Sequence, residues 1–250
     1  MQNVLVGLIA FALIFGGALA GLLAARLLPE DHLSPETRNA VSVSMAVVGT
    51  LAALVIGLLI STASRSFADR SDALAELSSS LIRADRALLR YGPDGKDARA
   101  KLRAYASAKA AELFPQPGDP PVSDADTLGF LEAAQDDVVA LGAGTPQQDF
   151  LRTRALALIE HAFDARWKLF QEESGIPTPF LVLLIFWLVL VFASFGLFAP
   201  RNATVIAVMM LSALAISGGI VMILEFGSPF YGIIQVSPDP LRKALTEMGR

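Results

Sequence analysis

The sequence predicts an all-α membrane protein with four transmembrane helices and a cytoplasmic helical bundle inserted between spans 2 and 3. Composition is the first observation: hydrophobic residues make up 54% of the 250 residues, charged residues only 18%, and the mean hydropathy is +0.53. The second is the presence of four apolar runs of the ~20 residues that a bilayer-spanning helix needs. The third is a charged segment between the second and third runs, whose apolar residues recur with helical spacing.

These patterns divide the chain into four predicted parts. Residues 1–64 hold spans 1 and 2, and residues 65–178 form a cytoplasmic helical domain continuous with the helix of span 2. Residues 179–226 hold spans 3 and 4. Residues 227–250 form an interfacial turn and a short C-terminal helix.

The first apolar run covers residues 4–25 and contains Gly17 and Gly21 at GxxxG spacing. Ala18-Leu19-Ala20 resembles a signal-peptidase site. However, no Lys or Arg precedes the run, and the run continues past this site. We therefore expect a retained transmembrane helix.

One long helix is predicted from residue 40 to residue 91, with Ser34 and Pro35 as a possible start because Ser caps helices and Pro suits the first turn. Residues 43–60 are apolar without a charge, and residues 65–91 are charged and amphipathic. Neither proline nor a turn cluster separates the two. At 1.5 Å per residue the helix is roughly 78 Å long, more than twice the thickness of a hydrocarbon core. We expect it to leave the membrane and continue into water.

Small residues line one face of the membrane part of this helix. They recur at spacings of three and four within an arc of about 120°, whereas bulky residues such as Val48, Leu51, Val55 and Leu58 point the other way. Close helix packing is one interpretation, because small residues let backbones approach in lipid. A pore wall whose hydroxyl groups face water is the other. Both remain open for this small-residue stripe, formed by Ser42, Ala46, Gly49, Thr50, Ala53, Gly57, Ser61 and Ser64.

The aqueous part of the helix carries two further stripes. One has the spacing of a coiled-coil seam and comprises Leu74, Leu77, Leu81, Ala84, Leu88 and Tyr91. The other is acidic in its first half and basic in its second: Asp69, Asp72, Glu76, Ser79, Arg83, Arg86 and Arg90. It is interpreted as a solvated face, or alternatively as a charge zipper between subunits or a basic ring at the end of a pore. Together, the seam and the small-residue stripe suggest a homo-oligomer around span 2.

Turn and cap signals divide the rest of the bundle into three helices, at residues 96–114, 124–141 and 146–173. Ser123 is the expected cap of the second, and Thr145 with Gln148 forms the expected capping box of the third.

Residues 180–198 and 204–224 are the third and fourth apolar runs, joined by a tight turn. Glu225 follows the fourth run as a membrane-edge acid, which we expect to cap a helix or reach the interface rather than conduct ions. A final amphipathic helix is predicted at residues 241–248.

Lys and Arg residues predict the orientation. Residues 63–178 carry fourteen of the 20 Lys and Arg residues, whereas the connection between spans 1 and 2 has two and the last connection has one, Arg201. The positive-inside rule therefore places the bundle and both termini in the cytoplasm.

Few groups are available for chemistry. The chain has no cysteine and only two histidines, His32 and His161, so thiolate or histidine metal clusters are not expected. It has no phosphate-binding glycine loop and no nucleophile elbow. A net charge of −4 gives no reason to expect nucleic acid. No charge lies near the middle of a span, which argues against coupled transport. We expect no enzyme activity, no cofactor and no metal; a passive pore or a membrane-anchored assembly protein remains.

Several motifs resemble the bestrophin-like family of bacterial membrane proteins, whose function is unknown. They are GTLAALVIGLL at residues 49–59, Ser66-Phe67 with Arg70, and Arg86 with Tyr91-Gly92-Pro93. FASFGLFAPRNAT at residues 192–204, and Ile223-Leu224-Glu225 with Pro229-Phe230 and Gly232, are similar to its second half. The resemblance implies kinship with bestrophins, pentameric anion channels with four spans, cytoplasmic termini and a pore lined by the second span. The chain lacks the bestrophin Asn-Pro-Phe neck and acidic calcium-binding cluster.

The resulting hypothesis is an oligomeric passive channel in the bacterial inner membrane that favours anions such as chloride. Its expected partners are the lipid bilayer, further copies of the chain and small anions. The pore-lining residues would be Gly49, Thr50, Ala53, Gly57, Ser61 and Ser64, and the cytoplasmic charged lining would be Arg65, Arg70, Arg83, Arg86 and Arg90. The alternative is a membrane-anchored assembly protein without ion conduction.

Overall fold

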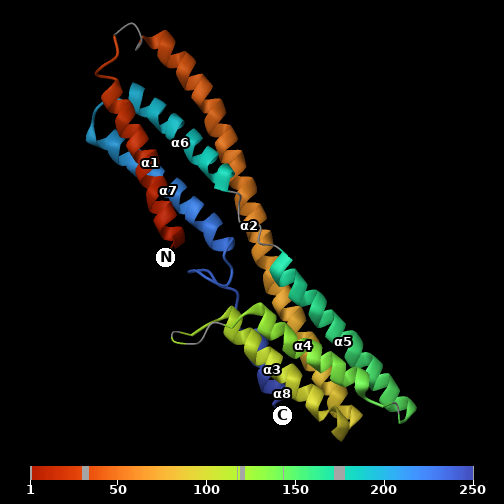
Figure 1. Cartoon of the computed structure of the whole chain (residues 1–250). Coiled ribbons are helices and arrows are strands. Elements are labelled where there is room, and N and C mark those ends of the chain that lie inside the picture. Colours follow the sequence, from red (N-terminus) through yellow and green to blue (C-terminus); the bar gives the residue numbers. More distant parts are fainter. Residues whose placement is uncertain are drawn as a thin grey trace. The chain divides into compact units, whose positions relative to one another are not determined.

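The computed structural model describes residues 2–29, 34–116, 118, 122–142, 144–171 and 178–249, most of which lie in helices. These residues contain no strand, so the all-α prediction is confirmed for them. Figure 1 shows the helices in chain order: α1 (Gln2–Ala24), α2 (Pro35–Tyr91), the 3-10 helix η2 (Pro93–Gly95), α3 (Lys96–Leu113), α4 (Asp124–Ala140), α5 (Pro146–Gln171), α6 (Thr178–Phe198), α7 (Ala203–Phe226) and α8 (Asp239–Met248). Of these, α1, α2, α6 and α7 are long and apolar enough to cross a membrane.

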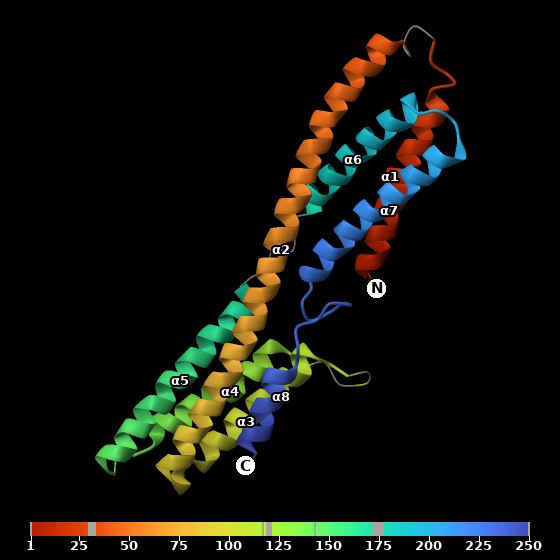
Figure 2. The ribbon, with the colours of Figure 1, turned by 180° about the vertical axis from the view of Figure 1, so that it is seen from behind.

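The chain forms two compact units, each built from segments distant in sequence. Unit 1 comprises Met1–Phe67 and Ser174–Ile234, and holds α1, the first part of α2, α6 and α7. Unit 2 comprises Ala68–Glu173 and Gln235–Arg250, and holds the rest of α2 with α3, α4, α5 and α8. The helix α2 belongs to both units and runs unbroken for 57 residues (Figure 2).

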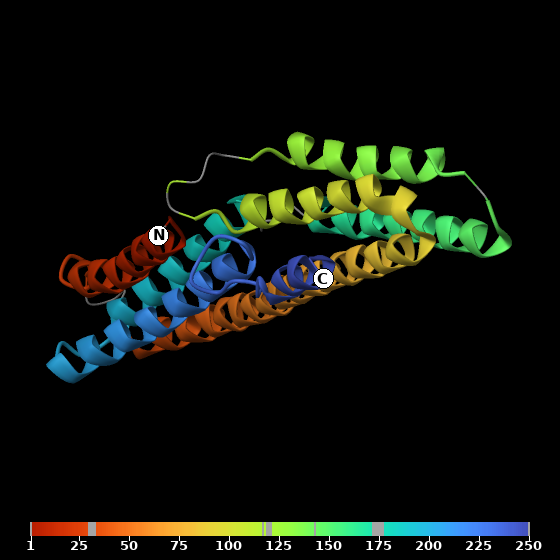
Figure 3. The ribbon, with the colours of Figure 1, turned by 90° about the horizontal axis from the view of Figure 1, so that it is seen from below.

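Helix α1 packs along both α6 and α7 within unit 1 (Figure 3). Two glycines allow its backbone to touch that of α6. A Cβ atom on Gly21 would overlap the carbonyl oxygen of Ala193, and a Cβ atom on Gly196 would overlap the carbonyl oxygen of Ala18. The GxxxG spacing noted in α1 therefore marks a helix crossing in which small residues bring two backbones together.

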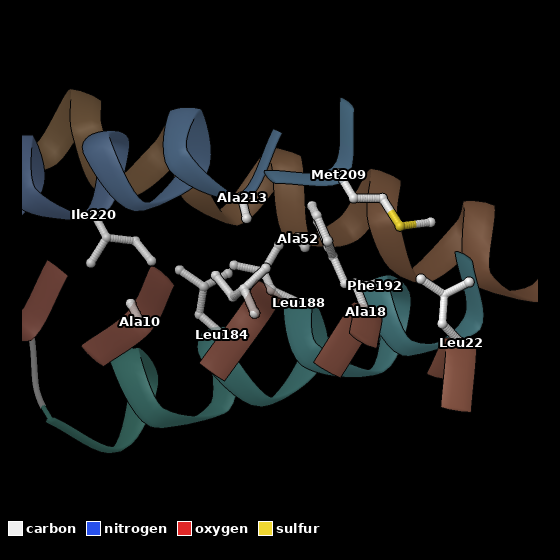
Figure 4. Packing of buried hydrophobic residues seen from close by; sticks show 11 residues of the cluster. Ala10, Ala18, Leu22, Ala52, Leu184, Leu188, Phe192, Met209, Ala213 and Ile220 are labelled. Atoms are coloured by element: carbon white, nitrogen blue, oxygen red, sulfur yellow. The ribbon is translucent and has the colours of Figure 1, made fainter. Parts of the chain in front are cut away.

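The hydrophobic core of unit 1 is unevenly shared among its four long helices (Figure 4). Helices α1, α6 and α7 each supply three or four buried side chains, whereas α2 supplies one, Ala52. Most of the surface of α2 is therefore not used for packing inside unit 1. The buried members are Ala10, Ile14, Ala18, Leu22, Ala52, Leu184, Leu188, Phe192, Met209, Ala213 and Ile220.

Unit 2 is a helical bundle whose core includes the aqueous part of α2. All six seam residues are buried, with exposed fractions of 0 to 5%. Ion pairs attach this part of α2 to its neighbours: Asp85 to Arg99 of α3 at 2.7 Å and Arg86 to Glu247 of α8 at 2.8 Å. Because the bundle of the same chain fills the seam, the seam does not support assembly between copies. That part of the oligomer argument was wrong, and only the small-residue stripe still carries it.

Three helices begin at the capping residues that the sequence suggests. The Ser34 hydroxyl accepts from the Thr37 backbone N–H at 3.2 Å, so α2 starts at Pro35, five residues before the predicted boundary. Ser123 and Asp126 form a capping box on α4. The Thr145 hydroxyl caps α5 by accepting from the Gln148 N–H at 3.2 Å. The predicted end of this helix at residue 173 lies outside the described residues.

Candidate pore-lining surface

The small-residue stripe of α2 points away from the rest of its own unit. Five of the six predicted pore-lining residues are exposed: Thr50, Ala53, Gly57, Ser61 and Ser64. The sixth, Gly49, is half-buried, and a Cβ atom built on it would lie 4.0 Å from the Val191 side chain of α6. A Cβ atom on Gly57 would meet nothing within 4 Å. The small residues therefore do not serve helix packing within the subunit, except at Gly49.

The opposite arc of α2 faces the core of unit 1. Ala52 is 1% exposed, and partly buried Val55, Ile56 and Leu59 pack against the same core cluster. These residues recur at spacings of three and four, as expected for one helix face.

A third arc, adjoining the small-residue stripe, is bulky and apolar. Its members are Val43, Val47, Leu51, Leu54 and Leu58, with exposed fractions of 49 to 60%. The sequence interpretation placed Val48, Leu51, Val55 and Leu58 together on the face opposite the small-residue stripe. Instead, Val48 and Val55 are half-buried inside the unit, whereas Leu51 and Leu58 are exposed. In total, α2 exposes an arc of about 200°, half small and half bulky.

The hydroxyl groups of the small-residue stripe are not equivalent. The Thr50 hydroxyl donates to the Ala46 carbonyl at 2.8 Å. The Thr50 side chain therefore presents only oxygen lone pairs and its methyl group to a molecule outside the helix. The hydroxyls of Ser61 and Ser64 have no such hydrogen bond within the described part of the chain, and their donors are available to another molecule. Within the described part of the chain, available hydroxyl donors therefore lie at both ends of the stripe, Ser42 at one end and Ser61 and Ser64, next to Arg65, at the other.

The predicted cytoplasmic charges differ in their surroundings. Arg65, Arg83 and Arg90 are exposed on α2. Arg86 pairs with Glu247, and Arg70 is buried with an exposed fraction of 8%. On the acidic half of this stripe, Asp69 and Asp72 are exposed, while Glu76 pairs with Lys168 at 2.8 Å. Hydrogen bonding to Glu76 raises the pKa of Lys168, but the pair is too exposed to add much stability.

Glu225 is a buried clamp rather than a lipid-facing acid. It is 2% exposed, and its carboxylate accepts from the Asn3 side chain at 3.1 Å and from the backbone N–H groups of Ile233 and Ile234 at 2.5 and 3.3 Å. The carboxylate thus joins the start of α1, the end of α7 and the segment that follows α7. The carboxylate does not cap a helix, because Ile233 and Ile234 lie in the non-helical segment after α7, and it does not reach the interface; the role expected from the sequence is therefore wrong. Its partner Asn3 could not be identified, because no local pattern relates residues 222 positions apart.

Replacing Glu225 with alanine is expected to destabilise the protein by about 1–3 kcal/mol, because it leaves buried donors without an acceptor. Glu225→Gln keeps one carbonyl acceptor and is expected to cost less. Thermal unfolding of the purified protein, followed by tryptophan fluorescence, measures both. An alanine variant as stable as the wild type would show that the clamp adds nothing.

Sequence reasoning also missed a charged cluster inside unit 2. Lys109 is fully buried and its ammonium group lies 2.9 Å from carboxylate oxygens of both Glu112 and Asp124. Asp124 also pairs with Arg166, and Glu112 accepts from the Thr127 hydroxyl at 2.8 Å. Two cations and two anions balance, so this cluster joins α3, α4 and α5 and leaves no net charge. Tyr105 is buried beside this cluster, and its burial raises the pKa of the phenol, which therefore stays neutral.

Acidic and histidine side chains do not gather elsewhere in a way that suits a metal. Within the described ranges, no group of three or more His, Cys, Asp or Glu residues is placed to hold an ion. His161 and Asp164, one turn apart on α5, are both exposed.

The comparisons with known proteins agree on one family. A family model described as a Bestrophin-like domain matches residues 12–241. A search of curated proteins finds no match.

Solved bestrophin homologues share the fold of the chain. A bacterial bestrophin homologue from Klebsiella pneumoniae, carrying a single substitution, has a TM-score of 0.70 and 14% identity, with 97% of this chain and 99% of that chain covered. A second variant of a Klebsiella pneumoniae homologue has a TM-score of 0.72 and 13% identity, covering 100% and 99%. Because the family model spans most of the sequence, the chain belongs to the bestrophin-like family.

Proposed function

We propose that the chain is one subunit of an oligomeric passive ion channel in the bacterial inner membrane, with the small-residue stripe of α2 lining the pore. The observation that carries this proposal is the exposure of Thr50, Ala53, Gly57, Ser61 and Ser64 on a helix that supplies one described residue, Ala52, to the buried apolar cluster of unit 1. In lipid, an exposed stripe of small and hydroxyl-bearing residues is favourable when it meets water or another backbone. Membership of the bestrophin-like family also supports a channel function, because this family is named after the bestrophin anion channels.

The same surface supports a preference for anions such as chloride. Ser61 and Ser64 have free hydroxyl donors, and Arg65 adds a positive charge beside them. Arg83 and Arg90 add exposed positive charge further along α2, while Arg70 and Arg86 contribute less because one is buried and the other is paired. Asp69 and Asp72 oppose this preference. The donors and cations near Ser64 are therefore the proposed selectivity element. Ala53 would lie at the narrow part of the pore, whereas Gly49 faces the Val191 side chain of α6 and contributes less to the pore wall.

Replacing Gly57 with tryptophan is expected to reduce chloride efflux from proteoliposomes by roughly tenfold or more, because an indole from each copy would fill the pore. Gly218 of α7 is a matched control: it is also an exposed helical glycine, and a Cβ atom on it would meet nothing within 4 Å. We expect Gly218→Trp to leave efflux close to the wild-type rate. Equal loss in both variants would contradict a pore at α2.

The second candidate is an assembly protein that conducts no ions, in which the stripe is a dry interface between copies. Gly57→Leu would then change oligomer size in mass photometry while wild-type liposomes show no chloride efflux. Both proposals require an oligomer larger than a monomer, but only the channel proposal requires chloride efflux from the wild-type protein.

The proposed topology has four spans, with both termini and the unit 2 bundle in the cytoplasm. Single cysteines test it cleanly because the native chain has none. An impermeant thiol reagent added to intact spheroplasts is expected to label Glu36→Cys, in the first turn of α2, and not Gln147→Cys, in the first turn of α5. Both positions are exposed, so lysed cells should label both. Labelling of position 147 alone in intact cells would reverse the topology.

A further inference from the structure

We propose that a groove between α6 and α7 binds one phospholipid per subunit, with an acyl chain in the groove and the phosphate at Arg201. The proposal rests on the membrane insertion proposed above but not on ion conduction. The groove has a volume of about 350 Å³ and is lined by residues of α6 and α7 alone. This volume is typical of small-molecule binding sites.

The groove has a buried floor and exposed walls. Phe192 of α6 and Met209 of α7 form the floor, with exposed fractions of 4 and 8%. Phe195 and Val208 form the walls and are 49 and 57% exposed. A site closed below and open outward suits a ligand that enters from the surface of the unit.

The chemistry of the lining fits an acyl chain. Hydrocarbon and aromatic ring atoms make up nearly all of it, and the rings of Phe192 and Phe195 are inclined to each other at a centroid distance of 6.1 Å. The polar atoms come from Ser212, at the end of the groove far from the turn, and from Thr204 at its end next to the turn, whose hydroxyl can donate to an ester oxygen of the lipid. From Thr204 to Ser212 the groove follows α7 for roughly 12 Å, most of the depth of one leaflet.

Arg201 provides the charge for the headgroup. It lies in the turn between α6 and α7, three residues before Thr204, at the end of the spans where headgroups lie. One guanidinium nitrogen is 3.4 Å from the Leu22 carbonyl, a long hydrogen bond, and the residue is exposed. The remaining guanidinium donors can bind a phosphate in the bidentate manner typical of arginine. Arg201 does not line the groove, but it lies three residues from Thr204, which does, and its positive charge is complementary to an anionic phospholipid.

The test is native mass spectrometry of the delipidated full-length protein titrated with phosphatidylglycerol. Val208→Trp and Ser212→Phe each fill the groove, and Arg201→Gln removes the charge. Leu211→Trp is the matched control, because Leu211 is 59% exposed on α7 and does not line the groove. Phosphatidylcholine replaces phosphatidylglycerol in a parallel titration to measure the contribution of headgroup charge.

We expect one phosphatidylglycerol per subunit in the wild type and in Leu211→Trp, and loss of this lipid in both groove-filling variants. Arg201→Gln is expected to weaken phosphatidylglycerol binding about fivefold, the effect of one basic residue near an anionic headgroup. Lipid retained by Val208→Trp and Ser212→Phe would overturn the proposal. The proposal would also be overturned if these two variants kept the lipid but changed the size of the oligomer, because a second copy of the chain would then be the occupant of the groove. Absence of chloride efflux would leave the lipid result unaffected, so the two proposals fail separately.

Discussion

The Lys109→Met variant is expected to unfold at a temperature roughly 6–20 °C below the wild type, corresponding to a loss of about 3–5 kcal/mol. Lys109 is fully buried, and its loss leaves the Glu112 carboxylate, 10% exposed, without its cation. An unpaired buried charge costs more than the original pair contributes, because its desolvation is no longer offset. Thermal unfolding of the full-length protein at one scan rate measures the shift.

Lys101→Met is the matched control for this substitution. Lys101 lies on the same helix, α3, and pairs with Asp137 at 2.7 Å, but both side chains are substantially exposed. We expect a change of about 1 kcal/mol or less for this variant. The double variant Lys109→Met/Glu112→Gln should recover part of the stability, because it removes the unpaired charge. Similar shifts for Lys109→Met and Lys101→Met would mean that burial of the cluster has no energetic consequence.

The second large effect is expected where α1 and α6 cross. Gly21→Ala and Gly196→Ala each place a methyl group on a backbone carbonyl of the facing helix, and a Cβ atom on Gly21 would also lie 2.9 Å from the Leu197 amide nitrogen. Backbone cannot change rotamer to make room, so the helices must separate. We expect about 3 kcal/mol of destabilisation for each, at the upper end of the range for overpacking. Thermal unfolding and size-exclusion chromatography report it.

The control substitution is expected to change the stability of the protein in the opposite direction. Gly16 lies on the same helix, and a Cβ atom on it would meet nothing within 4 Å. Gly16→Ala is expected to stabilise the protein by up to about 1 kcal/mol, because alanine is the better helix former. The double variant Gly21→Ala/Gly196→Ala should cost less than the sum of the two, since one separation of the helices relieves both clashes. Equal effects of Gly16→Ala and Gly21→Ala would rule out the close crossing.

Most helices were predictable because their signals are local. Ser123 and Asp126 specify the start of α4 within four residues, and Asn202 caps α7 by accepting from the Val205 N–H at 2.8 Å. The exposed small-residue stripe was predictable for the same reason, since one helix face can be read from spacings of three and four. Such features require no knowledge of what lies across the fold.

Features that depend on distant residues were not predictable. Lys109 lies in an alanine-rich helix and looks like an exposed lysine until Asp124 and Glu112 are placed around it. The seam from Leu74 to Leu88 has the same spacing whether its own bundle or another copy fills it, and only the arrangement of α3, α4, α5 and α8 decides between them. In each case the sequence indicates a surface but not its partner.

The unbroken length of α2 has a mechanical consequence. From Leu58 to Tyr91 the helix contains neither glycine nor proline, the residues at which helices most often kink. Its continuous hydrogen-bond ladder resists any change in the number of residues per turn, so the residues of its membrane part turn together about the helix axis. Because the small and bulky arcs adjoin, such a turn would exchange Ser61 and Gly57 for Leu54 and Leu58 on whatever α2 faces. The rotational setting of α2 about its own axis therefore decides whether small or bulky side chains meet its surroundings.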